Sequence, residues 1–153
     1  MRLFMSANLI FLLMALAAGI SIPTQAGINA QLNLFTRSPV LAATVSFAVG
    51  TLTLVVYALL ARTPLPSPES LSGHPWWVWT GGILGAFFVA STVVLAPRLG
   101  ASTMVVLVLA GQMIASLLLD HYGWLGYPVH TVSVGRIAGV VLVCLGVVLV
   151  RWF

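Results

Sequence analysis

Five long apolar segments dominate the pattern of hydrophobic and polar positions, and short polar or proline-rich stretches separate them. Each segment is close to the ~20 residues that an α-helix needs to cross the hydrocarbon of a bilayer. The pattern therefore predicts an all-α integral membrane protein with five transmembrane helices, in one domain over residues 1–153. These helices are expected at about residues 3–35, 40–61, 76–96, 101–120 and 133–151.

The first segment carries a polar stretch that begins at Pro23. Gln25, Asn29 and Asn33 recur every four residues, so they share one face of the helix. Side-chain amides at membrane depth need protein or water as partners rather than lipid. The stripe predicts the wall of a polar cavity. Hydrogen bonding between helices, without any ligand, is the alternative interpretation.

Polar residues in two further segments could join this cavity, namely Ser91 in the third segment and Gln112 in the fourth. Gln25 lies 12 residues before Arg37. Gln112 lies 12 residues after Gly100, which is in the loop on the same side. At 1.5 Å per residue both amides are roughly 18 Å from that surface, near the middle of the bilayer. We therefore predict these substrate-binding residues: Gln25, Asn29, Asn33, Ser91, Gln112 and Ser116.

Asp120 continues the polar face of the fourth segment. It is the only acid that a membrane segment could hold, because Glu69 lies in a proline-rich loop. A carboxylate at the mouth of a cavity could bind and release a transported proton. Histidine is the side-chain type whose charge changes near neutral pH, so we predict Asp120 and His121 as coupling residues. In the alternative, Asp120 lies in headgroup water or pairs with Arg62 or Arg136.

Composition supports a membrane protein and argues against several other functions. The chain is 61% hydrophobic and 5% charged, with a mean hydropathy of +1.15. All six basic residues are arginines spread one by one, which argues against a nucleic-acid partner. The lone Cys144 excludes an intramolecular disulfide. The chain has neither a His-Glu-x-x-His zinc pair nor a Gly-x-Ser-x-Gly elbow, so no enzyme, cofactor or metal is expected.

The arginines also bear on orientation, because five helices put the two termini on opposite sides of the membrane. Each side then carries three arginines: Arg2, Arg62 and Arg136 against Arg37, Arg98 and Arg151. The positive-inside rule gives no preferred orientation for such a chain, which predicts insertion both ways. Two oppositely inserted copies would form an antiparallel homodimer with ten helices and inverted symmetry, an arrangement found in many secondary transporters. A paralogue could take the place of the second copy.

Three groups of residues resemble the five-helix YdcZ-like family of the drug/metabolite transporter superfamily, and together they extend over nearly the whole chain. The resemblance implies a half-size transporter of the bacterial inner membrane that works as an antiparallel pair. It implies no substrate and no site residues. Unlike the four-helix small multidrug resistance proteins, the first helix has no acid, which argues against export of cationic drugs. The resembling stretches are Pro23–Ala30, Gly81–Val89 with Ala96–Gly100, and Ala110–Met113 with Leu119–Gly123.

The expected function is thus secondary transport of a small polar or amphipathic metabolite by an antiparallel dimer in the bacterial inner membrane. Its expected partners are a small-molecule substrate, membrane lipid and a second, inverted chain. Two alternatives remain open from the sequence. One is a small dual-topology ion channel, since amide-lined pores suit anions or water. The other is a membrane scaffold subunit that transports nothing, which a fifth helix without strongly polar residues would also fit.

Overall fold

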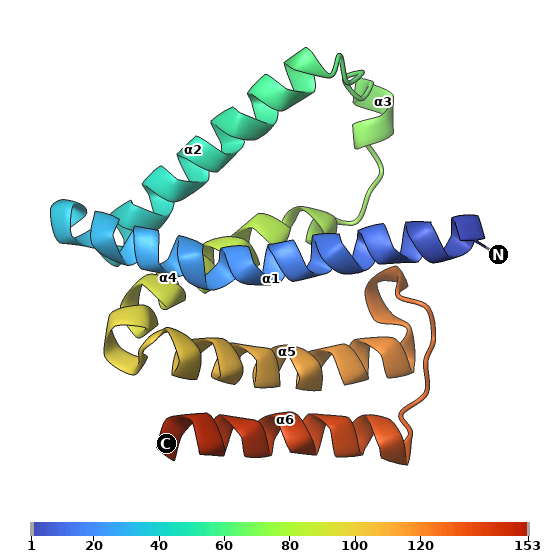
Figure 1. Ribbon diagram of the computed structural model, residues 1–153. Coiled ribbons are helices and arrows are strands. Elements are labelled where there is room, and N and C mark those ends of the chain that lie inside the picture. The colour runs from blue at the N-terminus through green and yellow to red at the C-terminus, as the bar shows by residue number, and fades with distance from the viewer. Residues whose placement is uncertain (1, 153) are drawn as a thin grey trace. The chain divides into compact units, whose positions relative to one another are not determined.

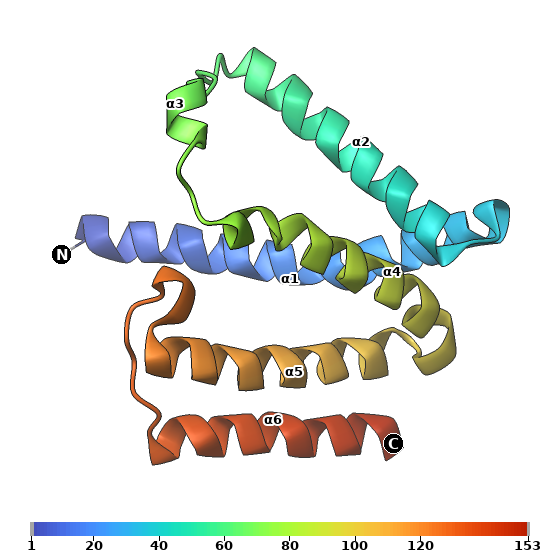
Figure 2. The ribbon, with the colours of Figure 1, turned by 180° about the vertical axis from the view of Figure 1, so that it is seen from behind.

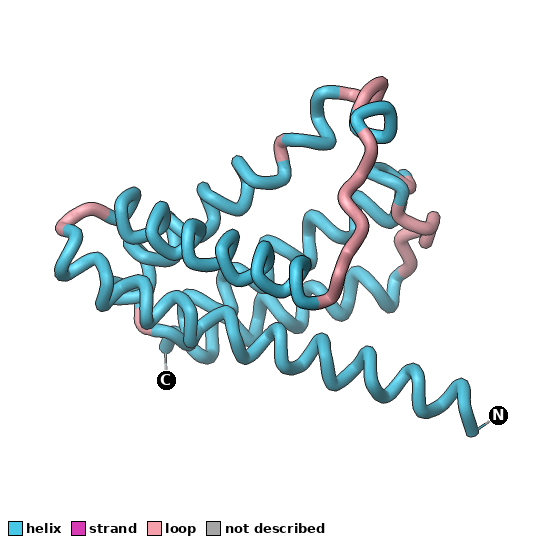
Figure 3. The backbone as a smooth tube through the Cα atoms, turned by 90° about the horizontal axis from the view of Figure 1, so that it is seen from above, coloured by secondary structure: helices cyan, strands magenta, loops and turns pink. Residues whose placement is uncertain are grey.

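The computed structural model of the chain describes residues 2–152, with side chains for residues 9–152. Within this range the elements are helices and loops, with no strand (Figure 3). The five long helices have the length and hydropathy of membrane spans, which confirms the predicted all-α membrane fold. They are α1 (Arg2–Thr36), α2 (Pro39–Leu60), α4 (Gly81–Leu99), α5 (Ala101–Tyr122) and α6 (Val134–Trp152) (Figure 1).

The chain divides into two compact units, and α1 passes from one to the other between Pro23 and Thr24. The unit that we call the α2–α4 unit holds residues 24–97. The unit that we call the α5–α6 unit holds residues 1–23 and 98–153. The expected single transmembrane domain stays a prediction, and each unit is described by itself below.

A tight turn joins α1 to α2. Ser38 has an extended backbone (φ −151°), and its hydroxyl accepts a hydrogen bond from the Leu41 N–H at 3.3 Å. Pro39 follows at the first helical position, where its missing N–H costs nothing. Arg37 at the end of α1 and Arg62 after α2 both adopt left-handed backbones, with φ of 52° and 51°. Helices commonly end on one left-handed residue, although glycine is the usual choice.

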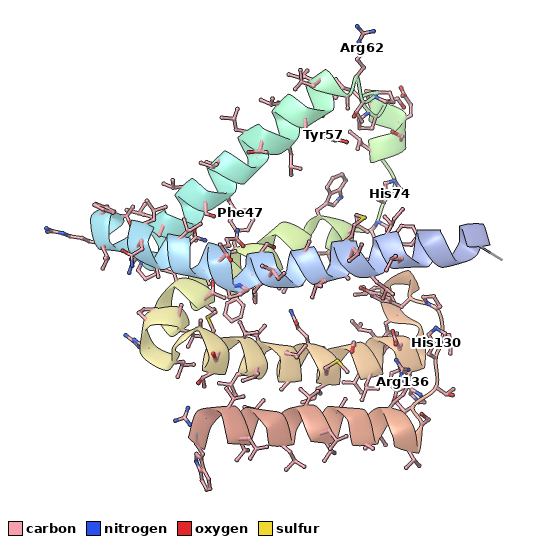
Figure 4. All side chains as sticks on the ribbon, viewed as in Figure 1. Phe47, Tyr57, Arg62, His74, His130 and Arg136 are labelled. Atoms are coloured by element: carbon pink, nitrogen blue, oxygen red, sulfur yellow. The ribbon has the colours of Figure 1, made fainter. Side chains whose placement is uncertain are left out.

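The α2–α4 unit contains the second part of α1 with α2 and α4. A Cβ added to Gly85 of α4 would lie 3.3 Å from the ring of Phe47 on α2, so the missing side chain lets the two helices approach (Figure 4). The buried apolar residues of this unit are small or β-branched, as expected for close packing between membrane helices. The buried apolar residues are Ala26, Ala42, Ala43, Val89 and Val93.

The connection between α2 and α4 is mostly irregular, as its four prolines predict, but it contains a short helix, α3 (Pro68–Leu71). The backbone N–H of Glu69 and the hydroxyl of Ser67 hydrogen-bond the Glu69 carboxylate and lower its pKa. The tryptophan-rich stretch that follows forms a separate 3₁₀ turn, Trp76–Trp79, and α4 proper begins at Gly81. The loop is therefore more ordered than a simple linker.

In the α5–α6 unit, α5 and α6 lie side by side and run antiparallel (Figures 1 and 2). Met104, Val140 and Val147 are buried. Gly123 ends α5 in a left-handed conformation (φ 62°), and its N–H bonds the Leu119 carbonyl. This conformation suits glycine and turns the chain sharply into the loop before α6.

Candidate functional site

The amide stripe of α1 lies on one continuous helix, because α1 passes through Pro23 without interruption. Asn29 is 3% exposed and Ala26, three residues earlier, is 2% exposed. Asn33 is half-buried, one turn beyond Asn29. Gln25 is exposed. The centre of the stripe thus lies in the protein interior, and Gln25 lies at its edge.

Two atoms of the stripe are buried without a hydrogen-bond partner among the described residues. They are the amide nitrogen Nδ2 of Asn29 and the amide oxygen Oδ1 of Asn33. A buried polar group without a partner costs roughly 1–3 kcal/mol, and most buried polar groups in proteins are paired. Helix-to-helix hydrogen bonding would give these atoms partners in the protein. Their unpaired state therefore favours a missing ligand, water or second chain as the partner.

Gln25 lines a pocket of about 210 Å³ against α2. Its wall is apolar except for the Gln25 side-chain amide and two hydroxyl-bearing residues, Ser46 and Thr51. It is large enough for a few water molecules or a small polar group. The lining residues are Gln25, Ser46, Phe47, Gly50, Thr51 and Leu54.

Ser91 lines a second pocket, of about 470 Å³, between α2 and α4. This volume falls within the range of about 300–1,000 Å³ that is typical of small-molecule sites. The neighbouring Thr92 is 3% exposed, but its hydroxyl donates to the Val89 carbonyl at 2.8 Å and so is satisfied within α4. Apart from Ser91, the lining is apolar: Pro39, Val40, Phe87, Ala90, Val94 and Leu95.

The polar stripe of α5 differs from that of α1. Gln112 is exposed, and Ser116 is half-buried. The Ser116 hydroxyl donates to the Met113 carbonyl of its own helix at 3.0 Å. Gln112 and Ser116 stay predicted site residues, since nothing in the α5–α6 unit assigns them a ligand.

Asp120 forms an ion pair with Arg136, near the start of α6. Arg136 also donates to the His130 carbonyl at 2.8 Å, and the His130 N–H donates to the Asp120 carbonyl at 2.9 Å (Figure 4). The Val132 N–H donates to Nδ1 of His121 at 3.3 Å. These contacts fasten the loop before α6 to the end of α5. They match the alternative in which Asp120 pairs with Arg136, and they add His130, which sequence reasoning missed because its backbone makes the contacts.

The predicted residues therefore fall into two sets. Gln25, Asn29, Asn33 and Ser91 belong to the α2–α4 unit. Gln112, Ser116, Asp120 and His121 belong to the α5–α6 unit. The equal depth of Gln25 and Gln112 stays a prediction. The described residues include no group of three His, Cys, Asp or Glu side chains that could hold a metal ion.

Comparison with known proteins assigns the chain a family. A family model described as "Putative inner membrane exporter, YdcZ" matches residues 10–149. The inner membrane protein YdcZ of Escherichia coli (strain K12) is 28% identical over 145 residues, which cover 95% of each chain. No solved structure matches the chain.

The unpaired state of Asn29 gives a prediction about stability. Asn29→Leu removes the buried N–H group at similar side-chain size, so we expect the melting temperature of the purified protein to stay the same or rise. Gln31→Leu is the matched control, because Gln31 is an exposed amide on the other side of α1. Thermal melts of both variants in one detergent would measure the effect. A loss of roughly 1 kcal/mol or more in Asn29→Leu alone would instead support hydrogen bonding between helices.

Proposed function

We propose that this chain, which belongs to the YdcZ family, is one half of a secondary transporter for a small polar or amphipathic metabolite. It is a multi-pass protein of the inner membrane with five helices that could span it. The description of the family as exporters supports a transport role rather than an enzymatic one. The substrate class, the dimer and the dual topology are the proposed part.

The observation that carries the proposal is the pair of unpaired amide atoms on α1. Polar groups at membrane depth mark substrate pathways, since hydrocarbon gives them no partners. Here the Asn29 amide is buried but unsatisfied, and Gln25 on the same stripe lines a pocket. A polar solute that crosses the membrane beside α1 would supply the missing hydrogen bonds.

The proposed dimer rests on the incompleteness of a single chain and on its charge balance. Within each span, only 6–17% of the most apolar 18-residue window is buried, so much of every helix is left to lipid or to a second copy. Three arginines on each side remove any charge preference for one orientation. In the proposed ten-helix assembly, the inverted copies would bring two α1 stripes toward the middle of the bilayer, where secondary transporters bind substrate.

Reporter fusions test the proposed dual topology. A C-terminal phosphatase, active outside the inner membrane, and a C-terminal fluorescent protein, active inside it, should both give signal for the parent chain. Arg37→Gln removes a charge from the C-terminal side, so we expect more phosphatase signal. Arg62→Gln is the matched variant on the other side, and it should raise fluorescence instead. Both arginines have left-handed backbones, so the two changes are alike in local conformation.

Signal from one reporter only, in cells that lack a related partner protein, would contradict dual topology. A shift in the same direction by Arg37→Gln and Arg62→Gln would contradict the charge-balance explanation. Membrane levels of each fusion, measured on blots, would separate orientation from expression.

Asp120 and His121 remain the proposed coupling residues, and a measurement of charge movement tests them without a known substrate. A coupling acid that exchanges protons with water should give a transient current when membranes carrying the protein are exposed to a pH jump. We expect Asp120→Asn to abolish this current. Arg136→Gln removes the ion-pair partner and keeps the acid, so it should leave a current.

If the current persists in Asp120→Asn, the coupling role is wrong. The Asp120–Arg136 pair would then serve to fasten the loop before α6. In that case both variants should lower the melting temperature to a similar degree, because each leaves one charged partner half-buried and alone.

A further inference from the structure

Asn29 and Asn33 present complementary hydrogen-bonding atoms one helical turn apart. The unpaired Nδ2 of Asn29 is a donor, and the unpaired Oδ1 of Asn33 is an acceptor. Side chains four residues apart on a helix are neighbours, with Cβ atoms about 5–6 Å apart. A ligand that satisfies both atoms must therefore offer an acceptor and a donor close together. Primary amides, ureas and the edges of nucleobases have this arrangement.

The helical residues that belong to the α2–α4 unit carry no charge. Residues 24–36, 39–60 and 81–97 contain no Asp, Glu, Lys, Arg or His. The arginines nearest in sequence are exposed: Arg98 lies in the last turn of α4, and Arg37 and Arg62 lie beyond the ends of α1 and α2. An ion moved from water to such a site would lose its hydration without gaining a counter-charge, which costs several kcal/mol or more. The site therefore selects against anions and cations.

An apolar pocket lies at a matching depth in the same unit. Asn29 lies seven residues before the end of α1 at Thr36, and Ser91 lies eight residues before the end of α4 at Leu99. Successive spans cross the membrane in opposite directions, so the C-terminal ends of α1 and α4 lie on the same side. At 1.5 Å per residue the two residues are thus roughly 10–12 Å from those ends. The 470 Å³ pocket that Ser91 lines is otherwise apolar, so it suits a hydrocarbon group.

We propose that the Asn29–Asn33 pair binds an uncharged amphipathic ligand, with an adjacent donor and acceptor at one end and an apolar group at the other. The inference deepens the proposed transport function, because this ligand would be the substrate class. Only the identification of this ligand as a transported substrate rests on the proposed function. Binding to the purified protein can be measured whether or not the protein transports anything.

Four compounds with the same six-carbon body test the ligand class. Hexanamide offers both a donor and an acceptor, and N,N-dimethylhexanamide keeps only the acceptor. Hexanoate and hexylammonium carry opposite charges. Binding to the protein in lipid nanodiscs, with empty nanodiscs subtracted, should be tightest for hexanamide. We expect the dimethyl compound to bind about three- to tenfold more weakly, for the loss of a hydrogen bond, and the ions more weakly still.

Two asparagine variants test whether the amide pair is the part of the protein that binds hexanamide. Asn29→Leu and Asn33→Leu should each weaken hexanamide binding about three- to tenfold, and Gln31→Leu should leave it unchanged. Equal binding of the four compounds, binding of none, or hexanamide binding that both Asn variants retain would overturn the inference. Melting curves would show whether each variant is folded, and the two Asn positions provide independent tests.

Uptake of labelled hexanamide into proteoliposomes then separates the two proposals. Amide-selective, Asn29-dependent binding without uptake would support the ligand class and count against transport. Asn29-independent uptake of a charged compound would support transport and overturn the ligand class.

Discussion

A polar group inside hydrocarbon must have a hydrogen-bond partner. Backbone groups meet it by forming helices. Several hydroxyl side chains meet it by donating to a carbonyl of their own helix, at 2.8 Å for Thr53 to Val49 and 2.9 Å for Thr44 to Val40. The amide of Asn29 is buried and does not meet it. The difference between satisfied hydroxyls and an unsatisfied amide is what singles out α1 as the helix with a missing partner.

The same chain is also incomplete in its packing. Only 6–17% of the most apolar 18-residue window of each span is buried, and the buried residues are largely small or β-branched. Lipid can cover apolar surface at no cost, but lipid tails cannot hydrogen-bond the Asn29 amide. A second copy and a polar solute can together supply what one chain lacks. In the proposed dimer, the even distribution of arginines and the amide stripe have one common explanation.

Much of the fold could be predicted from the sequence, because apolar segments of about 20 residues have few alternatives to a membrane helix. The hydroxyl of Ser38 and the left-handed backbone of Gly123 explain where α2 begins and where α5 ends. The third span begins at Trp76, near its predicted start, but a 3₁₀ turn, Trp76–Trp79, precedes α4. Both lie in one apolar run, so hydropathy alone does not separate them.

The candidate site was less predictable than the fold. Helical spacing put Asn29 on the right face, but it could not say that its amide lacks a partner, because that depends on every side chain around it. The pairing of Asp120 with Arg136 rather than Arg62 depends on the path of the loop after Gly123, which spacing along the chain does not determine. The proposed ligand class rests on unpaired side-chain atoms and on the pocket between α2 and α4, and helical spacing along the chain determines neither.

Counting labels on intact dimers measures directly whether the two copies in each dimer have opposite orientations. A Leu65→Cys chain in a Cys144→Ala background has one reactive thiol, in the exposed loop after α2. Sealed membrane vesicles would be treated with a maleimide that cannot cross the bilayer, and native mass spectrometry would then weigh the extracted dimers. We predict dimers of two 16.2 kDa chains in which every dimer carries a single label, on one of its two chains. A mixture of doubly labelled and unlabelled dimers would contradict it, because the two copies in each dimer would then share one orientation.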